Sequence, residues 1–156
     1  MSEDARFEDG ADRPLKLRAE DISDLEVISS LIQDSIIVPS EISWTPKDRR
    51  FALLINRFRW EDKTTYRNVE RVQSVLAFDD ISRVSAFGVD QHNPKDILSL
   101  LGIGWKDLTD ASGNFELAFS GGKTLSLESE CINVILQDVT RPYVAPSNMT
   151  PEHPEA

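Results

Sequence analysis

Short segments of alternating apolar and polar residues, joined by very short turns, dominate this chain of 156 residues. The segments 70–78 and 81–89 are separated only by Asp79-Asp80, and the segments 115–119 and 125–127 flank Gly121-Gly122. Turns of this length and composition join antiparallel strands, because a parallel crossover needs about a dozen residues or more. The pattern therefore predicts a mostly antiparallel β protein in which both turns close hairpins.

The amino-terminal part of the sequence predicts one amphipathic helix. Asp21 is a suitable N-cap, and the helix is expected to run to about Asp34. Its apolar residues fall on one face at helical spacing: Ile22, Leu25, Ile28, Leu31 and Ile32. Further strands are expected at residues 15–18, 36–44 with a break at Pro39, 50–60, 97–105 and 131–139, the last of which also fits a helix.

About eight strands and one helix indicate the α+β class. Two architectures satisfy this element list, a small antiparallel β-barrel and a two-layer sandwich, with the helix covering an open face or end. The length suits a single domain, which we place at residues 14–141. The acidic segment 1–13 and the proline-rich segment 142–156 have little to bury, so both are predicted to be disordered tails.

Composition narrows the cellular setting and the class of protein. The single cysteine excludes an internal disulfide, and the acidic start lacks the basic and apolar regions of a secretion signal. The longest apolar run, residues 51–55, is far shorter than the roughly 20 residues that span a bilayer. These features predict a cytoplasmic protein with no membrane association.

Charge is distributed unevenly along the chain. The net charge is -10, but residues 44–71 contain eight Lys or Arg against four Asp or Glu, so this basic segment carries +4 and the remainder -14. The overall charge disfavours general nucleic-acid binding, because phosphates are also negative. A local site for an anionic partner remains compatible with it.

The basic segment supplies the candidate binding residues. Six of its eight cations are arginines, whose planar groups suit carboxylates and phosphates, and aromatic residues lie among them. If Arg57 and Arg59 share a strand face, their guanidinium groups lie about 7 Å apart. We therefore select Arg50, Arg57, Arg59, Trp44 and Trp60. The alternative is that the arginines pair with acids across the sheet and that the tryptophans belong to the core.

Catalytic, cofactor and metal sites are not predicted. The sequence completes neither a phosphate-binding loop nor a dinucleotide fingerprint. Cys131 is expected to be a small core residue, with its pKa raised by the neighbouring acid Glu130. The acids Asp79, Asp80 and Asp90, beside His92, fit solvated turns better than a Mg²⁺ or Ca²⁺ site.

Several strings of residues resemble an uncharacterised family of small bacterial proteins. The strings are Leu15-Lys16-Leu17-Arg18-Ala19-Glu20-Asp21, Trp44-Thr45-Pro46 with Arg49-Arg50-Phe51, Asn56-Arg57-Phe58-Arg59-Trp60-Glu61, and Gly121-Gly122 with Glu130-Cys131 and Gln137-Asp138. The resemblance covers residues 15–143. It implies a bacterial, cytoplasmic, single-domain protein and supplies no catalytic residues.

Three functions are compatible with these features. The first is a non-catalytic binding or adaptor module whose basic, aromatic face holds an acidic protein segment or an anionic small ligand. The second is a small enzyme or cofactor-binding domain with a pocket inside the barrel and acids near Asp79, Asp80 and Asp90 at its mouth. The third, disfavoured by the overall charge, is an RNA-binding module that stacks bases on Trp44 or Trp60.

Overall fold

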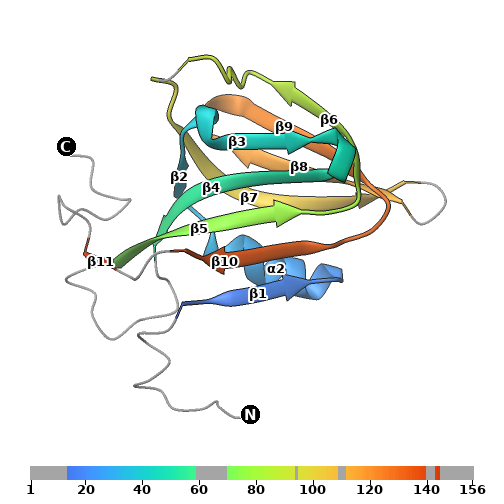
Figure 1. The fold of residues 1–156 in the computed structure, drawn as a ribbon, viewed down its shortest axis with the longest axis horizontal. Coiled ribbons are helices and arrows are strands. Elements are labelled where there is room, and N and C mark those ends of the chain that lie inside the picture. The colour runs from blue at the N-terminus through green and yellow to red at the C-terminus, as the bar shows by residue number, and fades with distance from the viewer. Residues whose placement is uncertain (1–13, 59–69, 94, 109–111, 140–142, 145–156) are drawn as a thin grey trace, which may run out of the picture.

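The computed structural model describes residues 14–58, 70–93, 95–108, 112–139 and 143–144 (Figure 1). Eleven strands in this part of the chain form one antiparallel sheet, accompanied by one α-helix. The elements are β1 (Lys16–Ala19), α2 (Ile22–Leu31), β2 (Ser35–Ile37), η2 (Pro39–Glu41), β3 (Ile42–Thr45), η3 (Pro46–Asp48), β4 (Arg50–Phe58), β5 (Glu70–Phe78), β6 (Ile81–Phe87), β7 (Leu98–Asp107), β8 (Gly113–Phe119), η4 (Ser120–Gly122), β9 (Lys123–Ser129), β10 (Val134–Asp138) and β11 (Tyr143–Val144).

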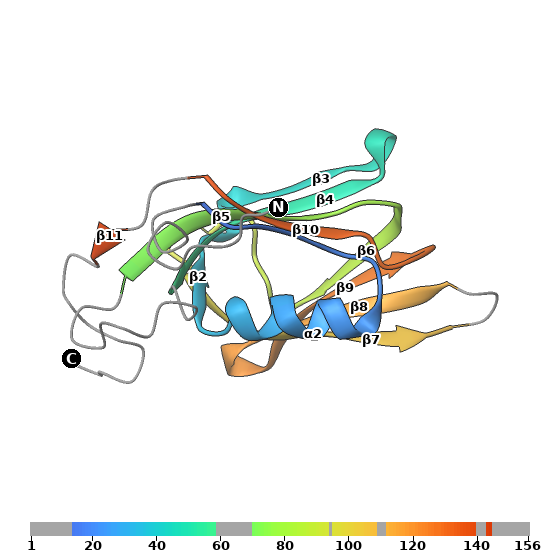
Figure 2. The same ribbon diagram turned by 90° about the horizontal axis from the view of Figure 1, so that it is seen from below.

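The sheet bends into two layers (Figure 2). The first layer has the order β1-β10-β5-β4, with β3 beside one end of β4 and β11 beside one end of β5. The second layer has the order β7-β8-β9-β6. The short strand β2 joins the layers, because Ile36 pairs with Asn56 of β4 and Ser35 pairs with Leu100 of β7.

The sheet does not close into a barrel, so the sandwich alternative is the one that fits. Its path ends at β1 in one layer and at β6 in the other. Helix α2 contacts both β1 and β7 and lies between them. The amide of Ile103 in β7 donates to the Ser29 hydroxyl of the helix at 3.0 Å. The two ends of the path, β1 and β6, do not pair with each other in the described chain.

The predicted helix is confirmed, including its start. The Asp21 side chain accepts a hydrogen bond from the amide of Asp24 at 2.8 Å, as an N-cap should. Leu25 and Ile28 are buried between the layers, whereas the helix ends at Leu31, before the expected Asp34. No helix in the described residues combines the length and apolar character that crossing a membrane requires.

Strand β4 shows how the interior is built. Phe51, Leu53 and Ile55 point inward and are buried. Arg57, two residues further along the same face, is buried as well. Phenylalanines from both layers meet in this interior, as the edge-on contact of Phe78 with Phe115 at 4.9 Å between ring centroids illustrates. The space that a barrel pocket would occupy is therefore packed with side chains.

Two predicted turns have different outcomes. Gly121 and Gly122 have φ values of 82° and 75°, which favour glycine, and they join the paired strands β8 and β9 as expected. Asp79-Asp80 was expected to close a hairpin, and this is wrong. Strand β5 pairs with β4, β10 and β11, while β6 pairs with β9. The turn instead forms a corner that carries the chain from the first layer to the second.

Two carboxy-terminal segments refine the expected boundaries. The segment 131–139 contains strand β10, which excludes its helical alternative. In the segment 142–156, which we predicted to be disordered, Tyr143 and Val144 form β11 and pair with Arg71 and Glu70. The remaining residues of this segment, the segment 1–13 and the predicted strand end at 59–60 lie outside the described residues.

Gly113 at the start of β8 offers a test of interior packing. A Cβ atom at this position would lie 2.1 Å from the Trp105 ring, which packs edge-on against Phe115. Gly113→Ala should therefore lower the free energy of unfolding by about 1–3 kcal/mol, because the indole has to move. Gly104→Ala in β7 is the matched control, since a Cβ atom there meets nothing within 4 Å. Urea denaturation measures both, and equal losses would contradict the close packing of Trp105 on Gly113.

Candidate functional site

Arg57, the central member of the predicted binding face, lies in the interior of the protein. Its side chain is 0 % exposed, and Nη2 lies 3.1 Å from both carboxylate oxygens of Asp138 on β10. The Ser74 hydroxyl on β5 donates to Asp138 Oδ1 at 2.6 Å and accepts from Arg57 Nε at 3.2 Å. The backbone amide of Leu15 donates to Asp138 Oδ2 at 2.8 Å. This buried network joins β4, β5, β10 and the residue that precedes β1.

The five predicted binding residues therefore do not form one exposed face in the described structure. Arg57 points inward, so it does not share an external surface with another arginine. Arg59 and Trp60 lie outside the described residues. Trp44 on β3 is half-buried against the core and packs on Phe51, with 6.5 Å between ring centroids, which agrees with the alternative of a core aromatic residue.

Arg50 is the predicted residue that lies on the surface. It forms a two-point ion pair with Asp79 at the end of β5, with Nε–Oδ1 at 2.8 Å and Nη2–Oδ2 at 3.0 Å. The hydrogen bonds from Arg50 lower the pKa of the Asp79 carboxyl below its usual value, and the same bonds raise the pKa of Arg50. The pair is exposed to solvent, so it orients both groups while contributing little to stability.

The outer surface of the first layer carries two cross-strand rows that the sequence pattern did not single out. Strand registers align these rows across the layer, one made of Lys16, Gln137, Val75 and Leu54, the other of Arg18, Ile135, Ala77, Ala52 and Ser43. The β1 end of each row is cationic. Val75 and Leu54 form the apolar part of the first row, after Gln137, and Ile135, Ala77 and Ala52 form that of the second. Helix α2 and the second layer lie on the opposite side of this layer, so these rows face away from the core (Figure 2). We call them the outer rows.

Except for Ala77, which is buried, the side chains of the outer rows are at least partly accessible in the described structure. Lys16 and Arg18 are exposed, and Leu54, Val75 and Ile135 are each partly exposed. Arg18 donates to the Asn133 side chain at 2.7 Å, which holds its guanidinium beside the residue that precedes β10. At the other end of the layer, Arg71 donates to the Asn56 side chain at 3.1 Å and lies 4.0 Å from the centre of the Phe58 ring. The alternation in residues 15–18 predicted a strand with two cations on one face, but not which strand would lie beside it.

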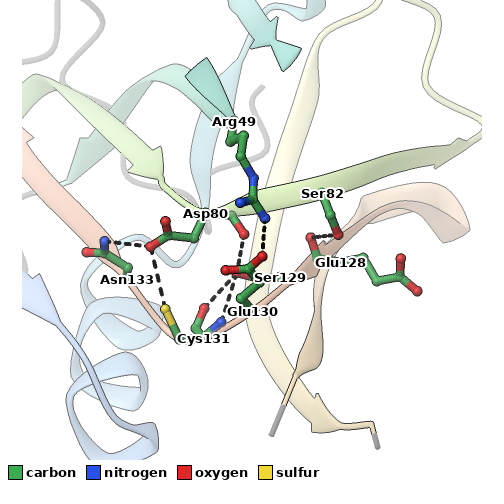
Figure 3. Close-up of polar contacts among 8 residues, drawn as sticks. All are labelled: Arg49, Asp80, Ser82, Glu128, Ser129, Glu130, Cys131 and Asn133. Carbon is green, nitrogen blue, oxygen red and sulfur yellow. Dashed lines mark hydrogen bonds and ion pairs between the residues drawn. The ribbon is translucent and has the colours of Figure 1, made fainter. Parts of the chain in front are cut away.

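A second polar cluster forms where the β5–β6 corner meets the β9–β10 connection (Figure 3). Asp80 has a left-handed backbone conformation with φ 65°. One of its carboxylate oxygens accepts from Asn133 Nδ2 at 3.1 Å and lies 3.5 Å from the Cys131 thiol. Its carbonyl oxygen accepts from the Ser129 hydroxyl at 3.1 Å. Arg49 completes the cluster by pairing with Glu130 at 2.6 Å.

The position of Cys131 corrects one expectation and confirms another. The residue is exposed on the β9–β10 connection, so its assignment to the core was wrong. The buried residues next to it are Ser129, at the end of β9, and Ile132 in the connection. The pKa of the thiol is raised as expected, first by partial desolvation and then by the hydrogen bond and charge of Asp80, with smaller effects from Glu130 and Glu20. A thiol in this environment holds little thiolate at neutral pH and is a poor nucleophile.

Asp79, Asp80 and Asp90, which the sequence analysis considered together with His92, do not surround a common point. Asp79 and Asp80 precede strand β6 and Asp90 follows it, so they lie near opposite ends of a seven-residue strand. Asp90 accepts from the backbone amide of His92 at 3.0 Å, as a turn acid does. Within the described residues no three His, Cys, Asp or Glu side chains are placed to hold a metal ion.

The contributions of the buried Arg57–Asp138 pair and the exposed Arg50–Asp79 pair to stability can be compared by making the same substitution at both arginines of β4. Arg57→Met should lower the free energy of unfolding by about 3–5 kcal/mol, because it leaves the Asp138 carboxylate buried and unpaired. Arg50→Met should cost at most about 1 kcal/mol, since the Arg50–Asp79 pair is exposed. Denaturant unfolding by circular dichroism measures both. The double variant Arg57→Met/Asp138→Asn should regain part of the loss, and equal effects of the two single variants would refute a structural role specific to Arg57.

The environment of Cys131 predicts that one substitution will make the thiol more reactive. Asp80→Asn removes the charge that raises the thiol pKa, while asparagine keeps the left-handed conformation accessible. The iodoacetamide reaction of Cys131 at pH 7.5 should become about two- to fivefold faster, because the gain in thiolate outweighs its lower nucleophilicity. Glu130→Gln is the control and should have a smaller effect. An unchanged rate in Asp80→Asn would show that Asp80 does not control the thiol.

Comparisons with known proteins give a family but no activity. No curated protein and no solved structure matches this chain. A family model described as "protein of unknown function (DUF2948)" matches residues 15–153, which includes β1, the buried ion pair and the whole of the sheet. The chain therefore belongs to the DUF2948 family of proteins of unknown function.

Proposed function

We propose that this protein is a non-catalytic binding module, and that the outer rows of its first layer hold an acidic, amphipathic segment of another protein. The observation that carries the proposal is the composition of those rows, in which partly exposed apolar side chains lie beside a cationic end formed by Lys16 and Arg18. Exposed apolar surface with a polar, charged rim is typical of protein-binding sites.

The charges of this surface favour an acidic partner. Lys16 and Arg18 are exposed on β1, and Asp79, which follows β5 and also interacts with the charge of Arg18, is engaged by Arg50. The cationic end therefore contrasts with a protein whose net charge is -10. Attraction between a local cationic surface and an acidic segment speeds encounter and fixes the orientation of the segment.

The apolar centre favours a protein segment over a small anion. Leu54, Val75 and Ile135 offer contacts to aliphatic or aromatic side chains, which an inorganic or small organic anion does not have. An amphipathic segment satisfies both parts of the surface, with apolar residues on the centre of the rows and acids on Lys16 and Arg18. This proposal retains the acidic partner predicted from the sequence but places it on β1, β10, β5 and β4 instead of around Arg57.

The enzyme alternative loses its structural basis in the described residues. It required a pocket inside a barrel with three acids at its mouth, whereas the sheet is open and its interior is packed. Asp79 and Asp80 lie apart from Asp90 and hold Arg50, Asn133 and Cys131. We therefore develop only the binding function.

A peptide-display selection tests the proposal. The library contains random peptides of about 16 residues, which as helices of about 24 Å can cross the four strands from β1 to β4. Selected peptides should be enriched in Asp or Glu at helical spacing from apolar residues. Their affinity, measured by fluorescence anisotropy, should fall at least about tenfold for Lys16→Glu/Arg18→Glu and should fall as salt rises.

Charge-matched variants separate this site from a general electrostatic effect. Lys95→Glu/Lys106→Glu changes the net charge equally, but both residues are exposed away from the outer rows. Its affinity should stay within about twofold of the wild type, because distant exposed charges are screened. Val75→Asp should weaken binding through the apolar centre. Peptides without acidic enrichment, or equal losses in both double variants, would refute the proposed face.

A further inference from the structure

Strand β6 is the longest unprotected edge of the described sheet. It has seven residues, pairs with β9 on one side, and forms the end of the sheet path. On its other side the amide of Ile81 donates to the Arg49 carbonyl oxygen at 2.9 Å, so the open edge begins after Ile81. The other edges are shorter or guarded. Strand β1 has four residues with two cations and contacts α2, while β3 has four residues and its Ile42 carbonyl oxygen accepts from the Gln91 side chain. Proteins usually shield long edges with charges, prolines or short strands.

The side chains of β6 offer little of this shielding. Its sequence Ile-Ser-Arg-Val-Ser-Ala-Phe contains one charged residue, Arg83, and no proline. Phe87 at its end is 71 % exposed, the highest value among the large exposed apolar residues of the described chain. An irregularity in the pairing with β9 lies between Ile81 and Arg83, so residues 83–87 form a regular run. Such a run can pair with another strand through its backbone groups.

A second copy of β6 is a suitable partner for this edge. A two-fold axis through Val84 places Arg83 opposite Ser85 of the second copy, and an axis through Ser85 places it opposite Phe87. Neither arrangement sets arginine against arginine, so the strand is electrostatically compatible with itself. Glu128 of β9 already lies beside Arg83 on the other side and balances its charge.

We propose that two copies of this protein associate through antiparallel pairing of their β6 strands, which extends the second layer across a two-fold axis. The dimer goes beyond the proposed binding function, because it uses the second layer and leaves the outer rows of the first layer open. Two such faces in one assembly would let the protein bind a partner with two acidic segments more tightly than one face alone.

Sedimentation velocity of the full chain tests the dimer over about 1 to 500 µM, a range that covers weak and moderate association. The wild type should change from monomer to dimer within this range. Ser85→Lys should raise the dimer dissociation constant at least about tenfold, because its ammonium group faces either Arg83 or its own copy across the axis. A wild type that stays monomeric throughout would overturn the proposal and leave the edge to a different protein.

A matched control tests the location of the contact. Ser126 lies opposite Ser85 on β9, one strand away from the edge, so Ser126→Lys adds the same charge to the same surface without entering the β6 contact. It should dimerise like the wild type. Similar dissociation of the Ser85→Lys and Ser126→Lys variants would overturn the edge-to-edge contact.

Disulfide trapping gives a positive signal that unfolding cannot imitate. In a Cys131→Ser background, Val84→Cys or Ser85→Cys should cross-link two copies under mild oxidation, because residues at the axis of an antiparallel pair have Cα atoms about 4.5–5.5 Å apart. Ser126→Cys should not cross-link. Equal cross-linking at all three positions would indicate random collision and overturn the proposal.

Discussion

The buried ion pair between Arg57 and Asp138 fixes the register of the first layer. Two charged side chains are fully removed from water, and their cost is offset only while each keeps its partners. A one-residue slip of β4 against β5 would turn Arg57 to the outside and leave Asp138 buried without a cation. Because Ser74 and the Leu15 amide also bind Asp138, the same constraint extends to β5 and to the start of β1. The outer rows are aligned as they are because this interior network is compatible with only one pairing of the strands.

This constraint also explains which parts of the structure the sequence could predict. The Asp21 N-cap, the Gly121-Gly122 turn and the ranges of β5 and β7 depend on neighbouring residues, so local patterns were sufficient for them. The direction of Arg57 depends on Asp138, which is 81 residues away and has no signal near β4. Alternation places Phe51, Leu53, Ile55 and Arg57 on one face of the strand, but arginine is usually exposed, so Arg57 was wrongly expected on a binding surface.

The two-layer arrangement likewise could not be predicted from the sequences of the turns. A two-residue connection such as Asp79-Asp80 predicts a hairpin when its strands are considered alone, but here the strands have better partners. Strand β5 lies between β4 and β10, and β6 completes the hydrogen bonds of β9. The left-handed conformation of Asp80 turns the chain out of the first layer, and the surrounding bonds from Ser129 and Asn133 hold this corner. The same local turn is therefore compatible with a hairpin or a corner, and only the long-range pairing decides between them.

The electrostatic surface follows from the same long-range pairing. Three cations of the basic segment, Arg49, Arg50 and Arg57, are neutralised by Glu130, Asp79 and Asp138, all of which lie outside that segment in the sequence. The cations at the end of the outer rows, Lys16 and Arg18, also come from outside it. An excess of positive charge in one segment of the sequence therefore does not predict a positive surface, because residues from distant strands pair with its cations. In an antiparallel sheet, the surface seen by a partner consists of rows that cross the strands, so the binding hypothesis has to be built on those rows and not on a continuous stretch of sequence.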